Sequence, residues 1–186
     1  MAQSGQVIEN VVTRERIKFL RTGEETGGEL SKWEVFVEPG GFAAAEHIHP
    51  EQEERFQIVS GRMRARIRGV ERVLEAGDTL VILPGVPHVW QNAGTGTLRM
   101  VLEFRPALKS ERFFETFFQL ARDGKTNRKG LPNLLQIAVL MGEYAHEIRL
   151  TRPPWIVQRA VFAILAPLAR WLGFRAYYPQ AQRTGA

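Results

Sequence analysis

The clearest candidates for chemistry are two histidines that lie close together in the N-terminal half of the chain. The chain has four histidines, and two of them form the sequence His47-Ile48-His49. Side chains two positions apart on a strand point to the same side, and Pro50 favours an extended conformation at His49. We therefore expect both imidazoles to project together, as metal ligands would, although a lone pair of this kind also occurs on ordinary surfaces and in cores.

A carboxylate follows the histidine pair on what reads as the next strand. The stretch ERFQIVSG alternates polar and apolar residues, with Glu54, Phe56 and Ile58 on one face. That face should point inward, and an unpaired carboxylate is costly to bury there. A salt bridge or a metal ion would remove this cost. Imidazoles are mostly neutral at pH 7, so the sequence favours the metal. Glu53 is the rival carboxylate, and it should point outward.

A third histidine lies downstream, after a tight turn. His88 follows Pro84-Gly85 and opens another short strand, on which Trp90 shares its face. Phe56, Ile58 and Trp90 are candidates for a pocket lining, although ordinary core packing is the simpler interpretation for all three. The chain has no cysteine, which excludes disulfides, zinc ribbons and a thiol nucleophile.

The elements that must position these residues change type near Pro106. Before it, short alternating runs such as KWEVF, RMRARI and TLRMVLEF are separated by glycine-marked turns, a pattern typical of an all-β sandwich or barrel. After it, phenylalanines recur at helical spacing behind Ser110, a candidate helix cap. Further helices are expected over 134–146 and from about 155 to 172. We therefore divide the chain into a β domain, 1–106, and a helical extension, 107–186.

Two motifs in the β region resemble the two conserved motifs of the cupin superfamily. The first is Gly41-x5-His47-x-His49-x4-Glu54-x6-Gly61, and the second runs from Gly77 through Gly85-x2-His88-x3-Asn92. One departure is that the family usually has proline where this chain has Leu83, with Pro84 one place later. The resemblance covers residues 30–104. It implies a mainly β fold, a cupin-type antiparallel barrel or jelly roll, here with a C-terminal helical extension.

The resemblance also implies a metal ion inside the barrel, held by His47, His49, Glu54 and His88. Such a ligand set suits Fe, Mn, Ni, Zn, Co or Cu and does not choose among them. Open coordination positions would take a small organic substrate, alone or with dioxygen, in an oxygenase or an isomerase. The rival class is a non-catalytic binding or sensor protein whose metal is structural or orients a ligand.

The helical extension holds most of the positive charge. The net charge of the whole chain is +5, and residues 105–186 alone carry 13 Lys/Arg against 5 Asp/Glu. Residues 155–172 form an amphipathic segment, too short and interrupted by Pro167 to span a bilayer, which needs about 20 apolar residues. Its apolar stripe comprises Ile156, Val161, Ile164, Leu165, Leu168 and Leu172.

Several partners are compatible with this segment. We favour packing on the barrel or on a second subunit, and hence a homodimer. Peripheral contact with an anionic membrane through 155–172 is the alternative. Nucleic-acid binding is not expected, because arginines are sparse there and no recognition motif occurs. The N-terminal stretch has no apolar core of signal-peptide length, so we expect a cytoplasmic location.

Overall fold

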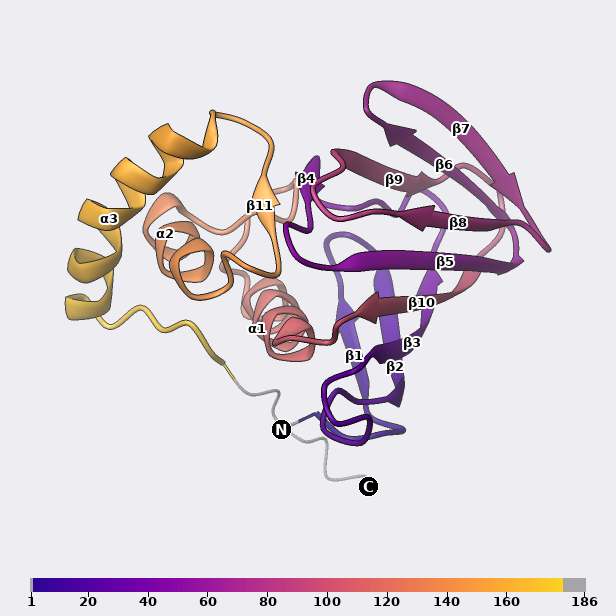
Figure 1. Cartoon of the computed structure of the whole chain (residues 1–186), viewed down its shortest axis with the longest axis horizontal. Coiled ribbons are helices and arrows are strands. Elements are labelled where there is room, and N and C mark those ends of the chain that lie inside the picture. The colour runs from indigo at the N-terminus through magenta and orange to yellow at the C-terminus, as the bar shows by residue number, and fades with distance from the viewer. Residues whose placement is uncertain (1, 179–186) are drawn as a thin grey trace.

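The fold consists of two antiparallel β-sheets flanked by three helices (Figure 1). The computed structural model describes residues 2–178. Within them, one sheet has the spatial order β1 (Val7–Asn10), β2 (Glu15–Arg21), β3 (Ser31–Val37), β10 (Leu98–Arg105), β5 (Glu53–Ser60) and β8 (Thr79–Ile82). The other has the order β11 (Arg149–Leu150), β4 (His47–Ile48), β9 (His88–Asn92), β6 (Arg62–Ile67) and β7 (Val70–Glu75).

Alternation of side chains builds the core between the sheets. β3 buries every second residue, and Trp33, Phe19 and Phe104 are fully buried on the inner faces. The Trp33 and Phe104 rings lie 4.8 Å apart between their centroids. The predicted antiparallel jelly-roll architecture is therefore confirmed. In residues 2–178 the hydrogen-bonded ladders form two facing sheets and do not close into one continuous barrel.

The glycines of the two motifs have a steric role in this fold. Gly61 lies between β5 and β6 with a φ of +86°, and a Cβ there would come within 2.8 Å of Leu98 Cα. A Cβ on Gly41 would approach Thr13 O to 2.9 Å. Only glycine allows the chain to pass so close to its neighbours at these two turns.

Three helices follow the sheets: α1 (Ser110–Arg122), α2 (Leu134–Glu143) and α3 (Trp155–Trp171). The expectation that Ser110 caps α1 is wrong. Lys109 occupies the cap position, and the Ser110 hydroxyl instead accepts a hydrogen bond from Gln52 Nε2. α2 ends at Glu143 rather than His146, and the Asn133 side chain caps its start by accepting from Gln136 N.

The helices pack on the open end of the sheets. Phe114 of α1 contacts the Trp33 ring, with 4.8 Å between centroids, and also packs against the cluster formed by α2 and α3. The two-residue strand β11, which the sequence pattern did not predict, pairs with β4 and sets Leu150 opposite His47. Aromatic side chains thus pack against each other across position 106. The division of the chain into two domains at that position stays a prediction.

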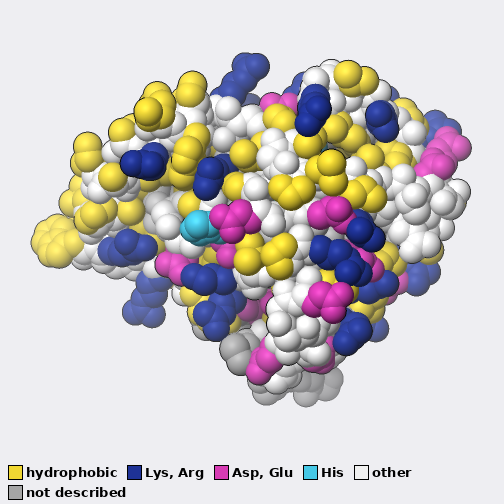
Figure 2. Space-filling view, in the orientation of Figure 1, with side chains coloured by type: hydrophobic (Ala, Val, Ile, Leu, Met, Phe, Trp, Pro, Cys, Tyr) yellow, Lys and Arg dark blue, Asp and Glu magenta, His cyan; other side chains and the backbone are white. Residues whose placement is uncertain are grey.

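α3 exposes most of the apolar stripe expected from the sequence. It packs on α2 through Phe162, Ala166 and Ala169, whereas Ile156 and Ile164 are 78% and 74% exposed. Apolar side chains accordingly gather over α3 at the left of the molecule in Figure 2. Among the helices of the described residues, none is long and apolar enough to cross a membrane. Homodimer formation and peripheral membrane contact stay predictions.

Candidate metal centre

The four predicted ligands converge at one end of the space between the sheets. His47 on β4 pairs directly with His88, the first residue of β9, and Glu54 lies on β5 of the facing sheet. His49 follows β4, with its side chain turned inward like that of His47. All four side chains are buried, and one candidate ligand atom from each lies within 4.8 Å of the others.

Each of the three imidazoles is oriented by a backbone carbonyl. Nδ1 lies 2.8 Å from Ala45 O in His47, 2.6 Å from Glu147 O in His49 and 2.9 Å from Val86 O in His88. A carbonyl can only accept, so each Nδ1 carries the hydrogen and donates it. In the neutral rings each Nε2 then carries a lone pair that points to the centre. This is the tautomer that metal ligation through Nε2 requires.

Polar atoms at the centre lack partners that would satisfy them. His49 Nε2, His88 Nε2 and Glu54 Oε2 are buried and make no hydrogen bond. Glu54 Oε2 nevertheless lies 2.8 Å from His88 Nε2 and 3.7 Å from His49 Nε2. Lone pairs at these distances repel each other unless a proton or a cation lies between them. The donor set, nitrogen and oxygen from four side chains, therefore fits a divalent transition metal.

Burial and the neighbouring Glu54 carboxylate together set the charge states of the three histidines. It lowers the pKa of His47 and of His49 to about 3, with a smaller contribution from His88 nearby. Burial also acts to lower the pKa of His88, but the adjacent Glu54 carboxylate outweighs it and raises that pKa. Without a metal, a proton on His88 Nε2 would satisfy Glu54. Proton and metal thus compete for the same two atoms.

The neighbouring carboxylate, Glu53, lies on the opposite face of β5. Its side chain is partly exposed and forms an ion pair with Arg55. Glu54, by contrast, is only 3% exposed. Strand alternation alone separates the two glutamates, one toward the centre and one toward the surface.

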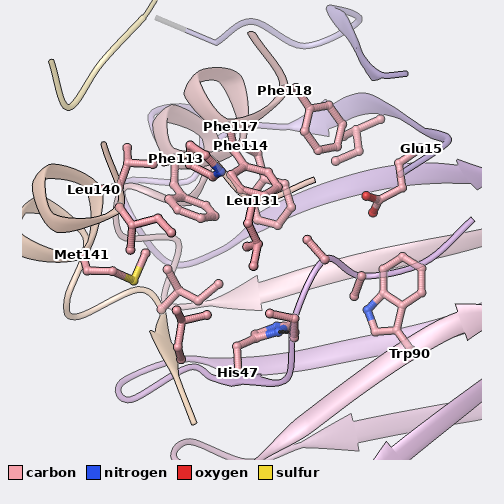
Figure 3. Close-up of a pocket in the computed structure, with 18 of the residues that line it drawn as sticks. Glu15, His47, Trp90, Phe113, Phe114, Phe117, Phe118, Leu131, Leu140 and Met141 are labelled. Atoms are coloured by element: carbon pink, nitrogen blue, oxygen red, sulfur yellow. Dashed lines mark hydrogen bonds between the residues drawn. The ribbon is translucent and has the colours of Figure 1, made fainter. Parts of the chain in front are cut away.

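A cavity of about 80 Å³ adjoins the centre and is lined mostly by apolar side chains. His47, Glu54 and Trp90 line its sheet side. Figure 3 shows His47 and Trp90 there, together with Phe113, Phe114 and Phe117 of α1, which form much of the helical side. Trp90 thus lines the cavity, as the alternation suggested. Phe56 and Ile58 are not part of this wall. They lie farther along β5 in the packed core, because alternation fixes the face of a strand and not the depth at which a cavity ends.

The cavity also contains an acid that we did not predict from the sequence. Glu15, the first residue of β2, is 7% exposed and lies on the Trp90 side of the cavity (Figure 3). Burial raises its pKa to about 8, against a smaller opposing effect of the Thr13 hydroxyl. The sequence does contain a signal for a buried Glu15, because Glu15 alternates with the inward-facing Ile17 and Phe19 on β2. Glu54 stands in the same relation to Phe56 and Ile58 on β5.

The helical extension contributes directly to the centre. The carbonyl that orients His49 belongs to Glu147, in the loop between α2 and β11. The Glu147 side chain is buried and accepts a hydrogen bond from Lys109 N, at 3.0 Å, at the start of α1. Residues beyond position 106 therefore help to position a candidate ligand, and no local sequence pattern indicated this.

Comparison with known proteins finds a family model that matches the β region of the chain. Residues 33–104 match the family model described as the cupin domain. This part of the chain, residues 33–104, is therefore a cupin domain. Its four buried residues His47, His49, Glu54 and His88 could bind a metal ion.

The individual relatives are distant. A curated protein named oxidoreductase, from Arthrobotrys oligospora, is 25% identical over 158 residues, which cover 77% of this chain and 61% of that protein. The chain thus spans less than two thirds of that relative. An RmlC-like cupin from Shewanella frigidimarina is 21% identical, with a TM-score of 0.49 over 60% of this chain and 94% of its own. Oxalate decarboxylase from Bacillus subtilis is 22% identical, with a TM-score of 0.47 over 55% of this chain and 28% of its own.

Proposed function

We propose that the protein binds one divalent transition-metal ion through the Nε2 atoms of His47, His49 and His88 and a carboxylate oxygen of Glu54. The observation that supports this best is the shared tautomer. Three separate carbonyls hold three Nδ1–H groups, so that three lone pairs meet one carboxylate in a buried space. Fe, Mn, Ni, Zn, Co and Cu all accept such ligands.

The proposed activity is that of a metal-dependent oxidoreductase acting on a small organic substrate. The curated relative named oxidoreductase supports this class, and so does the cavity beside His47 and Glu54. A bound metal would supply Lewis acidity and, if redox-active, electron transfer. Phe113, Phe114 and Phe117 would exclude water from the substrate. Glu15, whose raised pKa keeps it protonated at neutral pH, would hold a proton on the opposite side of the substrate.

A non-catalytic, ligand-binding role is the second candidate. It is favoured by the scarcity of polar side chains on the cavity wall, which offers Glu15 as the one carboxyl group besides the proposed ligand Glu54. Oxygen uptake by iron-loaded protein with a panel of small acids and alcohols separates the two roles. No uptake, and no conversion of any of these compounds by the Fe, Mn and Ni forms, would exclude the enzyme class for them and leave the binding role.

Metal analysis tests the proposed ligands directly. Protein purified without a metal-affinity tag should contain close to one equivalent of transition metal. His49→Ala should lose most of it, whereas His146→Ala should keep it, because His146 is exposed and contacts Glu51 at the surface. These two variants remove the same group from the same chain. Full metal content in His49→Ala would contradict the assignment.

The exposed face of α3 supports a separate proposal of peripheral contact with an anionic membrane. Ile156, Ile164 and Trp171 are highly exposed there. The printed sequence has no Asp or Glu after Glu147, whereas Arg159 and Arg170 lie on α3 itself. Two copies of this face would bring arginines together, whereas an anionic lipid surface would complement them. The charge therefore favours lipid over a second copy of the chain.

A further inference from the structure

An open groove with three arginines lies beside the cavity. It has a volume of about 760 Å³, and its charged side chains are Arg66, Arg68, Arg152 and Glu46. Arg68 lies in the turn after β6, and Arg152 lies between β11 and α3. The groove is thus formed jointly by the sheet and by the helical extension. We call it the arginine groove.

The arginine groove and the cavity share part of their walls. Ala45, Leu131 and Leu150 line both. Two of these residues also adjoin the candidate metal centre, since Ala45 O accepts the Nδ1 hydrogen of His47 and Leu150 pairs with His47 across β11 and β4. A molecule lying in the groove would therefore contact residues that also line the cavity, close to His47.

The groove carries excess positive charge that the protein does not neutralise. Glu46 is engaged already, because one of its oxygens lies 3.3 Å from Arg66 Nη2 and the other accepts a hydrogen bond from the Thr151 hydroxyl at 2.9 Å. Arg68 and Arg152 are exposed, and neither forms an ion pair with any residue in 2–178. Two guanidinium groups are thus free to bind an anion, and guanidinium suits carboxylate or phosphate oxygens in a bidentate arrangement.

We propose that the arginine groove is the mouth of the cavity and binds the carboxylate or phosphate group of a small amphiphilic substrate. The apolar part of that substrate would pass between Ala45, Leu131 and Leu150 into the cavity and reach the metal centre. This assignment rests on the proposed function and adds a substrate class to it. A cavity of about 80 Å³ has room for roughly five to eight non-hydrogen atoms, so the apolar part is a short chain or a single ring.

Affinity for matched probes tests the charge requirement. Hexanoate and hexyl phosphate carry the two kinds of anion, and 1-hexanol is the neutral control with the same chain. We expect calorimetry to show that the unmodified protein binds at least one anionic probe about tenfold more tightly than 1-hexanol, with an advantage that shrinks in high salt. The Arg68→Gln/Arg152→Gln double variant should lose this advantage. Which of the two probes binds better identifies the preferred anion.

A charge-matched variant serves as the control. Arg72 is exposed on β7, outside the groove, so Arg72→Gln should leave probe binding unchanged. Metal content should stay at the wild-type level in all of these variants, because none of the substituted arginines is a proposed ligand. The inference is overturned if neither anion binds better than 1-hexanol, or if the double variant binds the anions as the wild type does.

The orientation of the bound probe separates this inference from the proposed metal site. In protein loaded with Mn²⁺, nuclear relaxation of bound hexanoate should be fastest at the terminal methyl group, because the tail enters the cavity. Fastest relaxation at the carbon next to the carboxylate would place the anion on the metal and overturn the inference. If no relaxation enhancement occurs at any position while the arginine-dependent binding persists, the metal site fails and the anion site stands.

Discussion

At the scale of single residues, the candidate metal centre depends on how hydrogen bonds fix three imidazole rings. Because each Nδ1–H is donated to a backbone carbonyl, ring rotation and tautomer exchange would each cost a hydrogen bond. The rings are therefore oriented before any metal arrives. The same hydrogen bonds hold His88 Nε2 at 2.8 Å from Glu54 Oε2, although neither of these two atoms makes a hydrogen bond.

Glu15 gives the first prediction, which concerns pH and stability. The folded protein keeps the Glu15 proton up to a pKa of about 8, whereas the unfolded chain releases it near 4.5. Between these values the folded state binds more protons, so the contribution of Glu15 to the free energy of unfolding falls as pH rises. Glu15→Gln has no such proton. It should therefore gain stability relative to wild type as pH rises, by on the order of 5 kcal/mol at most.

Urea unfolding of the metal-free proteins at about pH 5 and about pH 8 measures this difference. Glu9→Gln is the matched control, because Glu9 lies on the neighbouring strand β1 with an exposed side chain. It should follow the wild type at both pH values. A difference between Glu15→Gln and wild type that does not change with pH would show that the Glu15 carboxyl ionises normally in the fold.

The side chains whose burial could be predicted from the sequence are those on strands with alternating polar and apolar residues. A period of two placed Glu54 inside and Glu53 outside, and it brought His47, His49 and Trp90 to the interior. The same rule applied to β2 would have found Glu15. What alternation could not supply is position along a strand, which is why Phe56 and Ile58 lie in the core and not on the cavity wall.

At the scale of elements, the loop between α2 and β11 links the helical extension to the metal centre. The Glu147 carbonyl orients His49, and the Glu147 carboxylate accepts a hydrogen bond from the N–H of Lys109, the residue at the N-cap of α1. Negative charge at a helix N-terminus is favourable. One residue thus connects a ligand, a loop and a helix. Neither this link nor β11 has a local sequence signal, since both depend on which segments meet in space.

Replacing Glu147 gives the second prediction. Glu147→Ala removes the acceptor for Lys109 N and should loosen the loop whose carbonyl holds His49. We expect the metal dissociation constant to rise about tenfold, as is typical when a residue that orients a ligand is changed. Glu147→Gln keeps an oxygen acceptor and should restore most of the affinity. Competition with a coloured chelator measures the dissociation constants.

The control for this variant is Glu143→Ala. Glu143 is more exposed and makes ion pairs with Lys109 Nζ and Arg170 at the surface, and such pairs contribute little. Its removal should leave metal affinity unchanged. If Glu147→Ala were less stable than wild type but bound metal with the same affinity, Glu147 would be structural only, and the carbonyl would hold His49 without help from the side chain.

At the scale of the whole molecule, the helical extension forms the part of the cavity wall and of the arginine groove that the sheets do not provide. The sheets bring the four candidate ligands together, and the Glu147 carbonyl of the helical extension orients one of them, His49. The cavity beside them is closed by α1 and α2, and the arginine groove needs Arg152 from the segment before α3. The sequence patterns indicated a helical extension and its charge, and they could not indicate which surface it covers. Its packing is decided by aromatic contacts such as Phe114 on Trp33.

The outer face of α3 gives the third prediction, because it covers no other described part of the chain. We expect the protein to sediment with vesicles of phosphatidylcholine mixed with phosphatidylglycerol, to bind much less to phosphatidylcholine alone, and to dissociate in high salt. Ile164→Glu and Trp171→Glu each place a negative charge on an exposed apolar position, and each should lower binding at least about tenfold. Val73→Glu is the control, since Val73 is 55% exposed on β7.

Two results would contradict this prediction. The first is that the wild type shows no preference for the anionic vesicles, or that Ile164→Glu binds them equally well. The second is that the wild type is dimeric in solution and Ile164→Glu is monomeric, which would make the α3 face an interface between two copies. The absence of acidic residues on α3 argues against that second result, because a symmetric pairing of the α3 faces would bring the arginines of the two copies together with no carboxylate of α3 to separate them.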